Sequence, residues 1–594
     1  MKHASALITI MLTTLLATAA SAFEPDPRGS RIASGGETSR QYPEGQMFPH
    51  LPIANTPPDK GNIIVEPQGD CRQTRAVLQA ALDMAPINIL LTRGEFCIDQ
   101  PLIVHSSTTI SGAQANGELL STIQQMSPAT SIFHLSKVWG VEIAHIWLDL
   151  NPDNLNPDIA SAKGISCQLN PWDPGRCLWR RGSGIAAYDT RGITVRGLHI
   201  TGGTYGIALL DQPLLERPLH GPQASFSLRD NANILRIEDD PCSTGRGNLS
   251  WTIEGNLIER ARDGLLALNL SHSTVERNTI RDSIKFNGIK IGCGPVENNR
   301  VAANYLAHNG VNSLGDGIDV AWGWTIESTG VTMGQPTNHN NQHTERCLET
   351  IEDVPDGVFQ NNTLTANLIW GNGANGIAIK TSPAQQENDC DGDPFDLPAE
   401  PPGDIMKLAR NDIIGNIIWG NGVGNAQCNQ GNCPFSQLEL RRLLPPLLET
   451  PGGEMRVTGN VLAAAPEVPA NGAFLHKIYG MEYIVNWHRG SVPGGKLRDI
   501  WIIDESQCEE VNATFLWNFA DQDDLDLPQE GNCSLLQTSA LPAWGFAYDW
   551  LVNAIVASHP YHLEDSDGDG CPNAREVLAG ADHLDPLNVP GSCP

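Results

Sequence analysis

The residues of this chain that could do chemistry gather in the segment from His308 to Trp324. Two carboxylates, Asp316 and Asp319, stand three residues apart, with His308 before them and Trp322 and Trp324 after them. Carboxylates act as acid and base on glycosidic bonds or hold calcium, and aromatic side chains stack on sugar rings. We therefore expect a carbohydrate site, with Asp316 and Asp319 as catalytic candidates and His308, Trp322 and Trp324 as substrate-binding candidates. The alternative is that the aspartates satisfy backbone amides in a turn.

Two lysines extend this set. Segments of the form Gly-apolar-x-apolar recur, and in such strands the apolar residues face inward and the residue between them faces outward. Stacking these segments gives one outward column with Ala208, Ala267, Lys290, Asp319 and Ala378, and a second with Leu210, Asn269, Gly292, Ala321 and Lys380. Lys290 and Lys380 therefore join the catalytic candidates in a shallow trough of small residues. An ordinary solvated face is the alternative.

The carboxyl end carries a calcium-loop pattern. Oxygen-bearing side chains stand at positions 1, 3, 5, 9 and 12 of a loop with Gly570 at position 6, and position 7 contributes a backbone carbonyl. That is the spacing of an EF-hand-type loop, in which alternate residues point to one centre and Gly permits the sharp turn. The expected Ca²⁺ ligands are Asp565, Asp567, Asp569, Cys571, Asn573 and Glu576.

The elements that must position the central residues are repeats of about 22 residues. The pattern apolar-x-x-Asn-x-apolar recurs with its Asn at positions 256, 278, 304, 367, 416 and 460. Each copy is followed by a Gly-apolar-x-apolar strand, so one unit holds short strands separated by Asn- and Gly-rich turns. This organisation predicts an all-β parallel β-helix, in which each Asn tolerates a left-handed turn and stacks on the Asn of the next coil. His145 and His199, assigned to equivalent positions of two coils, are interpreted as a polar surface pair.

A family resemblance supports the fold. Asp70 to Leu82, Ile89 to Phe96 and Thr109 to Gly112 resemble the N-terminal cap and first coils of pectate-lyase-like right-handed parallel β-helix proteins. The resemblance covers roughly residues 60 to 465 and implies a capping helix at Thr74 to Met84. It does not choose a reaction, because this fold hosts lyases, hydrolases, epimerases, esterases and adhesins. The carboxyl end resembles thrombospondin-type-3-like calcium repeats, in which such loops are structural.

Composition limits the setting in which the protein works. The 594 residues carry a formal net charge of −30, which disfavours nucleic-acid binding. An apolar stretch ending in Ala20-Ser21-Ala22 predicts a signal peptide cleaved after Ala22, and no later stretch could span a membrane. All 14 cysteines follow that cut, so we expect disulfides, with Cys71–Cys97 and Cys428–Cys433 among the neighbour pairings, although sequence leaves the connectivity open. Five Asn-x-Ser/Thr sites, at Asn248, Asn269, Asn361, Asn512 and Asn532, matter only in a source that glycosylates.

These observations combine into one expectation. The chain divides into a signal peptide at 1–22, an extension at 23–59, the β-helix at 60–465, a cap region at 466–560 and a calcium-binding segment at 561–594, with long insertions at about 325–360, 381–410 and 424–455. We expect a secreted, monomeric enzyme that acts on an extracellular polysaccharide, most concretely a lyase performing β-elimination on a uronic-acid-containing glycan. A non-catalytic glycan-binding or structural β-helix protein and a glycoside hydrolase are the alternatives.

Overall fold

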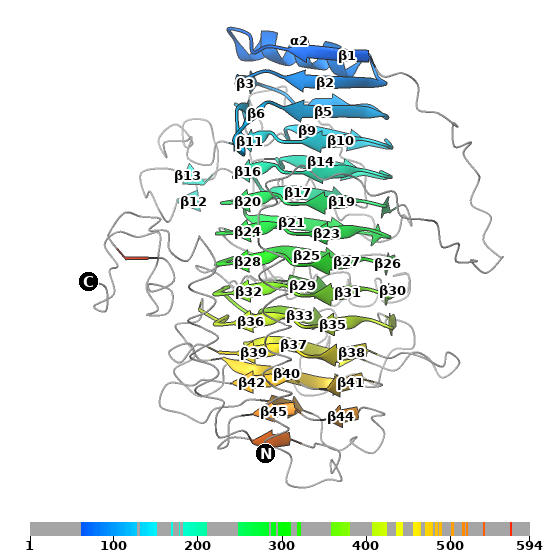
Figure 1. Ribbon diagram of the computed structural model, residues 1–594, viewed down its shortest axis with the longest axis vertical. Helices are drawn as coiled ribbons and strands as arrows, with labels where there is room; N and C mark the ends of the chain where they lie inside the picture. The colour runs from blue at the N-terminus through cyan, green and yellow to red at the C-terminus, as the bar shows by residue number, and fades with distance from the viewer. Residues whose placement is uncertain are drawn as a thin grey trace, which may run out of the picture.

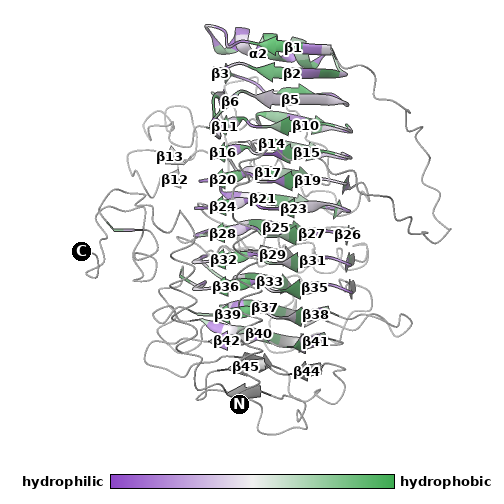
Figure 2. Cartoon of the chain, in the orientation of Figure 1, coloured by the Kyte–Doolittle hydropathy of each residue, from purple (hydrophilic) through white to green (hydrophobic). Residues whose placement is uncertain are grey.

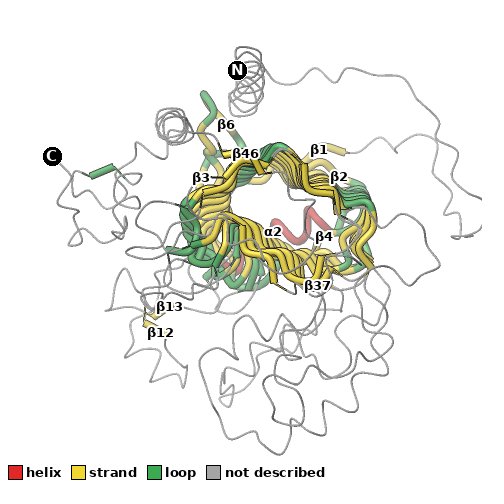
Figure 3. The backbone as a smooth tube through the Cα atoms, turned by 90° about the horizontal axis from the view of Figure 1, so that it is seen from below, coloured by secondary structure: helices red, strands yellow, loops and turns green. Residues whose placement is uncertain are grey.

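The computed structural model describes a stack of short parallel strands (Figure 1). The described residues are 61–126, 131–150, 168–169, 177–178, 182–210, 247–283, 287–292, 295–310, 318–321, 358–380, 407–423, 435–443, 455–464, 470–478, 481–484, 486–489, 500–503, 514–516, 518–520, 538–540 and 571–572. Seen end-on, the strands of successive coils superpose on one closed cross-section (Figure 3). The fold is therefore a solenoid rather than a set of separate layers.

Three long parallel sheets, named A, B and C here, run the length of the described coils. Sheet A contains, in order, β1 (Gly61–Val65), β2 (Ile87–Leu91), β5 (Thr108–Gly112), β10 (Glu142–Ala144), β15 (Thr194–Arg196), β19 (Thr252–Glu254), β23 (Thr274–Glu276), β27 (Arg300–Ala302), β31 (Thr363–Thr365), β35 (Asp412–Ile414), β38 (Met455–Thr458), β41 (Met481–Ile484) and β44 (Thr514–Leu516). Sheet B contains β3 (Gly94–Ile98), β8 (Ser121–Gln125), β11 (Trp147–Asp149), β16 (His199–Thr201), β20 (Leu257–Glu259), β24 (Thr279–Arg281), β28 (Tyr305–Ala307), β32 (Leu368–Trp370), β36 (Ile417–Trp419), β39 (Val461–Ala463), β42 (Trp487–Arg489), β45 (Asn518–Ala520) and β46 (Thr538–Ala540). Sheet C contains β4 (Leu102–Val104), β9 (Phe133–Ser136), β14 (Ile185–Tyr188), β17 (Tyr205–Leu210), β21 (Asp263–Leu268), β25 (Ile289–Gly292), β29 (Ile318–Ala321), β33 (Ile377–Lys380), β37 (Ser436–Leu443), β40 (Asn471–Ile478) and β43 (Ile500–Ile503).

Smaller sheets accompany the three long ones. A fourth sheet holds β18 (Asn248–Leu249), β22 (Leu270–Ser271), β26 (Pro295–Glu297), β30 (Val358–Gln360) and β34 (Lys407–Ala409). Two antiparallel pairs are β6 (Gln114–Ala115) with β7 (Glu118–Leu119), and β12 (Gln168–Leu169) with β13 (Cys177–Leu178). In one coil the chain passes from the fourth sheet to A, then B, then C, and parallel crossovers of this kind are right-handed. The protein is a right-handed parallel β-helix, as its repeats predict.

One apolar core fills the inside of the coils. Its members recur at the middle position of most described strands of sheets A and B and at alternate positions of sheet C, as in Ile253, Ile258 and Ile291. Figure 2 shows the apolar residues following the stacked strands along the molecule. Burying such a side chain stabilises the fold by about 1.5–3 kcal/mol, so every coil that is added extends a favourable interior.

The corner between sheets A and B is held by a ladder of buried asparagines. Asn304 shows the pattern: its backbone N–H and Nδ2 both donate to Oδ1 of Asn367 at 3.0 Å, and Nδ2 also donates to the carbonyl of Val275 at 2.9 Å. The same contacts link Asn256, Asn278, Asn304, Asn367, Asn416, Asn460 and Asn486. The predicted stacking of Asn on Asn is confirmed.

The backbone at this corner differs from the expectation in one respect. The residue before the ladder Asn has the left-handed conformation, for example Arg277 at φ 54° and Ala303 at φ 52°. The Asn itself is therefore selected for its amide, which satisfies buried backbone groups of two neighbouring coils, and not for tolerance of positive φ. Two further ladders at other corners were not foreseen: Ser273, Asn299, Asn362 and Asn411, and Ser283, Asn309, Asn372 and Asn421.

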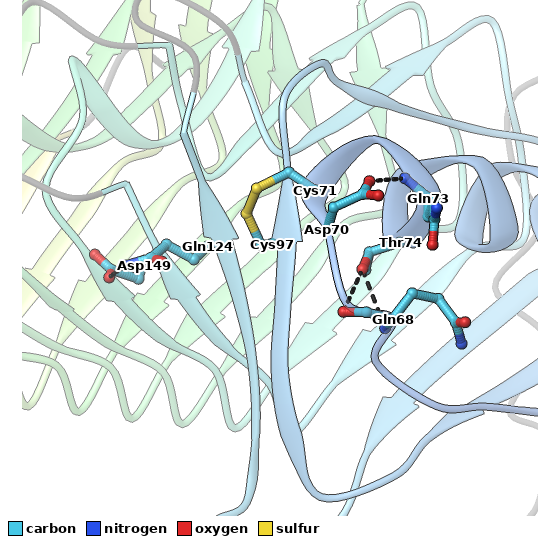
Figure 4. The surroundings of a disulfide bond; sticks show 8 residues. All are labelled: Gln68, Asp70, Cys71, Gln73, Thr74, Cys97, Gln124 and Asp149. Carbon is cyan, nitrogen blue, oxygen red and sulfur yellow. Dashed lines mark hydrogen bonds between the residues drawn. A yellow bond between two sulfur atoms is a disulfide. The ribbon is translucent and has the colours of Figure 1, made fainter.

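A helix covers the first coil. α2 (Cys71–Leu82) begins after Asp70, whose side chain accepts a hydrogen bond from the Gln73 amide at 2.7 Å, and it buries Leu78 and Leu82. This is the predicted capping helix, shifted by a few residues because Asp70 supplies the N-cap. The Cys71–Cys97 disulfide, one of the neighbour pairings considered above, ties the helix to β3 with the two Cα atoms 4.5 Å apart (Figure 4). The end of the solenoid is thus closed by packing and by a covalent link.

The strands continue beyond the expected boundary at residue 465. β40 to β46 pair in parallel with the coils before them, so residues 471–540 supply strands to sheets A, B and C rather than only to a separate cap. Likewise β37 lies inside the segment 424–455 that was expected to be an insertion. No helix in the described part of the chain is long and apolar enough to cross a membrane.

Candidate functional site

The outer face of sheet C carries a run of ionisable residues on five consecutive strands, β25, β29, β33, β37 and β40, which are stacked in Figure 1. In the first outward column, the register reads Leu266, Lys290, Asp319, Ala378, Glu439 and Phe474. In the second, it reads Leu268, Gly292, Ala321, Lys380, Arg441 and His476. On the preceding strands β14, β17 and β21 the same columns hold Ala, Leu and Tyr. We call this run the charged face of sheet C; it consists of Lys290, Asp319, Lys380, Glu439, Arg441 and His476 and therefore begins at Lys290.

The structure brings two of the predicted catalytic residues together. Lys290 and Asp319 are register partners on β25 and β29. Lys380 lies on β33, the strand after that of Asp319. It is in register with Ala321 and therefore belongs to the second outward column, whereas Asp319 belongs to the first. Asp316 lies outside the described residues, as do Trp322 and Trp324. Gly292 and Ala321, two of the small residues of the expected columns, are register partners on β25 and β29.

The register corrects two members of the expected columns. Lys290 is in register with Leu266 and Gly292 with Leu268, whereas Ala267 and Asn269 were expected at these places. The extra residue of β21 shifts its outward positions by one, because each step along a strand moves a side chain to the opposite face. Leu266 therefore precedes Lys290 in the first outward column, where the small residue Ala267 was expected.

Outward residues of sheet C are buried, unlike those of sheet A. Lys290 is 5% exposed and Glu439 is 2% exposed, while Arg196, at an outward position of sheet A, is exposed. Lysine and glutamate are rarely buried to this degree. Lys290 and Glu439 are therefore sheltered from solvent, where electrostatic interactions are stronger than at an open surface.

Glu439 and Arg441 were missed by sequence reasoning. Nδ2 of Asn375 donates to Oε2 of Glu439 at 2.6 Å, and the Ser436 amide donates to Oδ1 of Asn375 at 2.7 Å, so the carboxylate is held in a fixed orientation. The strand was missed because it lacks the Gly that precedes the other copies. The alternation Leu438-Glu-Leu440-Arg441 is the signal that could have found it.

His308 does not lie on sheet C. It follows β28 at the corner of sheet B, is 2% exposed, and packs on Trp370 with ring centroids 4.4 Å apart. Its Nδ1 lies 3.7 Å from Oδ1 of Asp282. Trp370 in turn stacks on Trp419, with centroids 5.4 Å apart and planes within 2°. His308 therefore packs in this stack at sheet B, and its expected role in substrate binding stays a prediction.

A second polar set lies on the outer face of sheet B. Nε2 of His199 contacts Oε1 of Glu259 at 2.7 Å, and Arg281 donates to Oε2 of the same carboxylate at 3.0 Å. The His199 ring also stacks on Trp147, its register partner, at 5.0 Å between centroids. His145 is not equivalent to His199, since it precedes β11 while Trp147 is in register with His199. The expected surface pair is therefore replaced by a network that links neighbouring coils.

The predicted calcium loop lies outside the described residues except at Cys571 and Pro572. Cys571 is buried and its sulfur is in a disulfide, so it cannot be a thiolate ligand. The use of its backbone carbonyl as a Ca²⁺ ligand stays a prediction. In the part of the chain that the structure describes, no cluster of three or more His, Cys, Asp or Glu residues could hold a metal ion.

No protein-family model and no curated protein sequence matches this chain. Among solved structures it is similar to the A-module of mannuronan C-5 epimerase AlgE6 from Azotobacter vinelandii, at 12% identity and a TM-score of 0.41, covering 78% of this chain and 91% of that chain. It is also similar to DFA-IIIase from Arthrobacter chlorophenolicus A6, at 10% identity and a TM-score of 0.39, covering 79% and 93%. A third similar structure is the N-terminal fragment of bacteriophage Phi29 gene product 12, at 12% identity and a TM-score of 0.43, covering 80% and 66%. The fold class rests on the strand order and register of this chain itself.

Proposed function

We propose that the protein is an exported enzyme that acts on an acidic extracellular polysaccharide at the outer face of sheet C. The observation that carries the proposal is Lys290, which is buried at an outward position and in register with Asp319. A buried lysine whose register partner is an aspartate, on a sheet whose outward columns hold three basic and two acidic residues, is better suited to a negatively charged sugar than a neutral surface would be.

The reaction that fits this set best is β-elimination on a uronic-acid residue. The Lys290 amine would take the proton at C5, the C4–O bond of the glycosidic link would break, and a C4=C5 double bond would form while the leaving oxygen gains a proton. Lys380 and Arg441, which are register partners, would neutralise the uronate carboxylate. Asp319, with Asp316 nearby in sequence, would bind sugar hydroxyl groups or a calcium ion that bridges to the uronate.

The test is an assay of the purified protein on a panel of polyuronates, following the ultraviolet absorbance of the new double bond. The substitution Lys290→Ala should lower the rate of double-bond formation by about 100-fold or more, because a positioned general base contributes that much. The matched control is Lys137→Gly, which removes an exposed lysine and keeps its left-handed backbone at φ 55°. Equal rates for wild type and Lys290→Ala would contradict the proposed role.

A hydrolase is the second candidate, because Glu439 adds a buried and oriented carboxylate to the face. Asp319 and Glu439 stand two strands apart, about 9.6 Å between backbones at the usual strand spacing. Inverting glycosidases separate their two carboxyl groups by about 6.5–9.5 Å. Release of reducing sugar without ultraviolet absorbance, abolished by Glu439→Gln, would establish this candidate. Binding without either product would leave a non-catalytic glycan-binding protein.

A further inference from the structure

Trp147 is an exposed tryptophan on the outer face of sheet B. It is 37% exposed, whereas Trp251, Trp370 and Trp419 are buried. It occupies an outward position of β11, because the residue after it, Leu148, is part of the core. A single exposed apolar side chain is ordinary on a protein surface. What sets Trp147 apart is the way in which its ring is held.

The indole of Trp147 is fixed from one side. Its Nε1 donates to Oγ1 of Thr201 at 3.0 Å, and its ring stacks on that of His199, with the planes 8° apart and the centroids 5.0 Å apart. His199 is held in turn by Glu259, since Nε2 lies 2.7 Å from Oε1. The indole therefore has one orientation before any ligand arrives, and a ligand that packs on it loses little affinity to ordering the protein.

The second face of the indole is turned toward β8. Two rings lying side by side in one plane would collide at 5.0 Å between centroids, so Trp147 and His199 are stacked face against face along the column. On the other side of Trp147 the register partner is Thr122, a short and half-buried side chain. The next residue of the column is the exposed Glu95, two strands from Trp147, which is about 9.6 Å at the usual strand spacing. Solvent therefore reaches the indole over Thr122, and the short side chain leaves room there.

Hydrogen-bonding groups lie beside this ring face. Gln124 and Asp149 are register partners in the next outward column of sheet B, and both are half-buried rather than enclosed. Nε2 of Gln124 donates to Oδ2 of Asp149 at 3.0 Å, and Figure 4 shows the two side chains beside each other. This bond turns the amide so that its donor is used and its Oε1 can accept. A fixed apolar face and a row of acceptors therefore stand next to each other.

This combination is suited to a sugar ring. A pyranose has faces of C–H groups, which pack on an indole, and hydroxyl groups at its edge, which donate to amide and carboxylate oxygens. A protein partner would need about 800 Å² on each side with several apolar anchors, whereas one indole among polar neighbours offers a single anchor. A uronate would bring its negative charge close to Asp149 and Glu95. The arrangement therefore favours an uncharged sugar.

We propose that the outer face of sheet B at β8 and β11 binds an uncharged sugar unit of a polysaccharide. The ring lies over Thr122 and packs on the second face of Trp147, while Oε1 of Gln124 and the carboxylate of Asp149 accept hydrogen bonds from its hydroxyl groups. The site holds a polysaccharide chain on the protein and performs no chemistry. It lies on a different sheet from the charged face and does not rest on the reaction proposed there.

The test is affinity electrophoresis of the whole chain in native gels that contain soluble neutral polysaccharides of glucose, mannose or galactose. We expect at least one of them to retard the wild type. Trp147→Ala should raise the Kd for that polysaccharide by about 10-fold or more, because an aromatic anchor at the centre of a contact contributes at least that much. The matched control is Trp139→Ala, which removes another exposed tryptophan, at the turn between β9 and β10, and should bind like the wild type.

A second variant keeps Trp147 and fills the space beside it. In Thr122→Arg the guanidinium group would lie over the indole face, so retardation should fall as in Trp147→Ala while the thermal midpoint stays unchanged. Retardation of wild type by none of the neutral polysaccharides, or equal retardation of wild type and Thr122→Arg, would overturn the proposal. Equal losses in Trp139→Ala and Trp147→Ala would also overturn it. So would binding of a choline salt in place of the neutral polysaccharides, because the ring would then be a cation site.

Discussion

Glu259 is held between two basic side chains on the outer face of sheet B. Burial alone would raise the pKa of this carboxyl, but the hydrogen bond with His199 and the charge of Arg281 outweigh it, so the pKa lies below its usual value of 4.5. A group whose pKa is lowered by folding contributes stability above its unfolded pKa, and that contribution is lost as the pH falls through the folded value.

Glu259→Gln should therefore destabilise the protein at neutral pH and matter less in acid. We expect a loss of about 1–3 kcal/mol, typical of hydrogen bonds to a charged group, in the free energy of unfolding at pH 7. The difference from wild type should shrink as the pH falls below about 4.5. Urea unfolding across this pH range measures it.

The exposed Glu95→Gln is the control, since Glu95 lies on the same face of sheet B and should change stability little at any pH. A Glu259→Gln variant whose deficit is the same in acid as at neutral pH would show that the charge of the carboxylate is not what stabilises the network. His199 would then act by packing against Trp147 alone.

At this scale the sequence predicted some residues and not others. Lys290 and Asp319 could be placed in neighbouring strands because each stands between apolar residues after a glycine. Glu439 could not, because its strand lacks that glycine. Asn269 was assigned to the wrong column, since one extra leucine in β21 changes which side chains face outward and no single strand reveals it.

At the scale of elements, the asparagine ladders replace side-chain packing at the corners of the coils. Each amide satisfies backbone groups that would otherwise be buried without partners. The asparagines in the middle of the ladder are linked to one on each side, whereas Oδ1 of Asn256 accepts, among the described residues, only from the Leu198 amide. The ladder therefore couples each A–B corner to the next.

Asn304→Ala should cost more stability than Asn256→Ala. The first change removes the hydrogen bonds that two N–H groups of Asn278 and the carbonyl of Val275 make with Asn304, which amounts to about 2–5 kcal/mol, and the second removes fewer. Urea unfolding of both variants gives the comparison. Asn298→Gly, an exposed left-handed position outside the ladder, should stay within about 0.5 kcal/mol of wild type.

Equal losses for Asn304→Ala and Asn256→Ala would mean that the ladder has no coupling along its length.

The element scale is also where prediction from sequence did best. Period-two strands, turn asparagines and a capping helix are local patterns, so they could be read from single segments. The strand β37 could not, because no glycine directly precedes it. The strands β40 to β46 were not predicted either, although Gly472 to Leu475 keeps the strand pattern and Asn486 continues the ladder.

At the scale of the whole molecule, the first coil and the carboxyl end of the chain have different features. The first coil is closed by α2 and the Cys71–Cys97 disulfide, so its strand edges are covered. At the other end of the chain, the sequence from Asp565 to Glu576 predicts a bound calcium ion.

Calcium removal should therefore lower the thermal midpoint. Binding at a concentration 100-fold above Kd stabilises the folded state by about 2.7 kcal/mol, and a chelator removes that contribution. Scanning calorimetry with and without chelator measures the shift, and adding calcium back should reverse it. In Glu576→Ala the chelator should have no effect. An unchanged midpoint in wild type would refute the calcium assignment.

The stacked tryptophans have a consequence for the history of the chain. Asn367 to Gly373 and Asn416 to Gly422 are almost identical in sequence, and they lie in adjacent coils with Trp370 over Trp419. Asn304 to Gly310, one coil earlier, keeps the asparagines and the last glycine but has lost the tryptophan. A coil is the smallest piece that can be added to a solenoid without disturbing its neighbours. The near-identity of these two coils is the mark that duplication of a single coil would leave, and it falls in the part of the solenoid that carries the charged face.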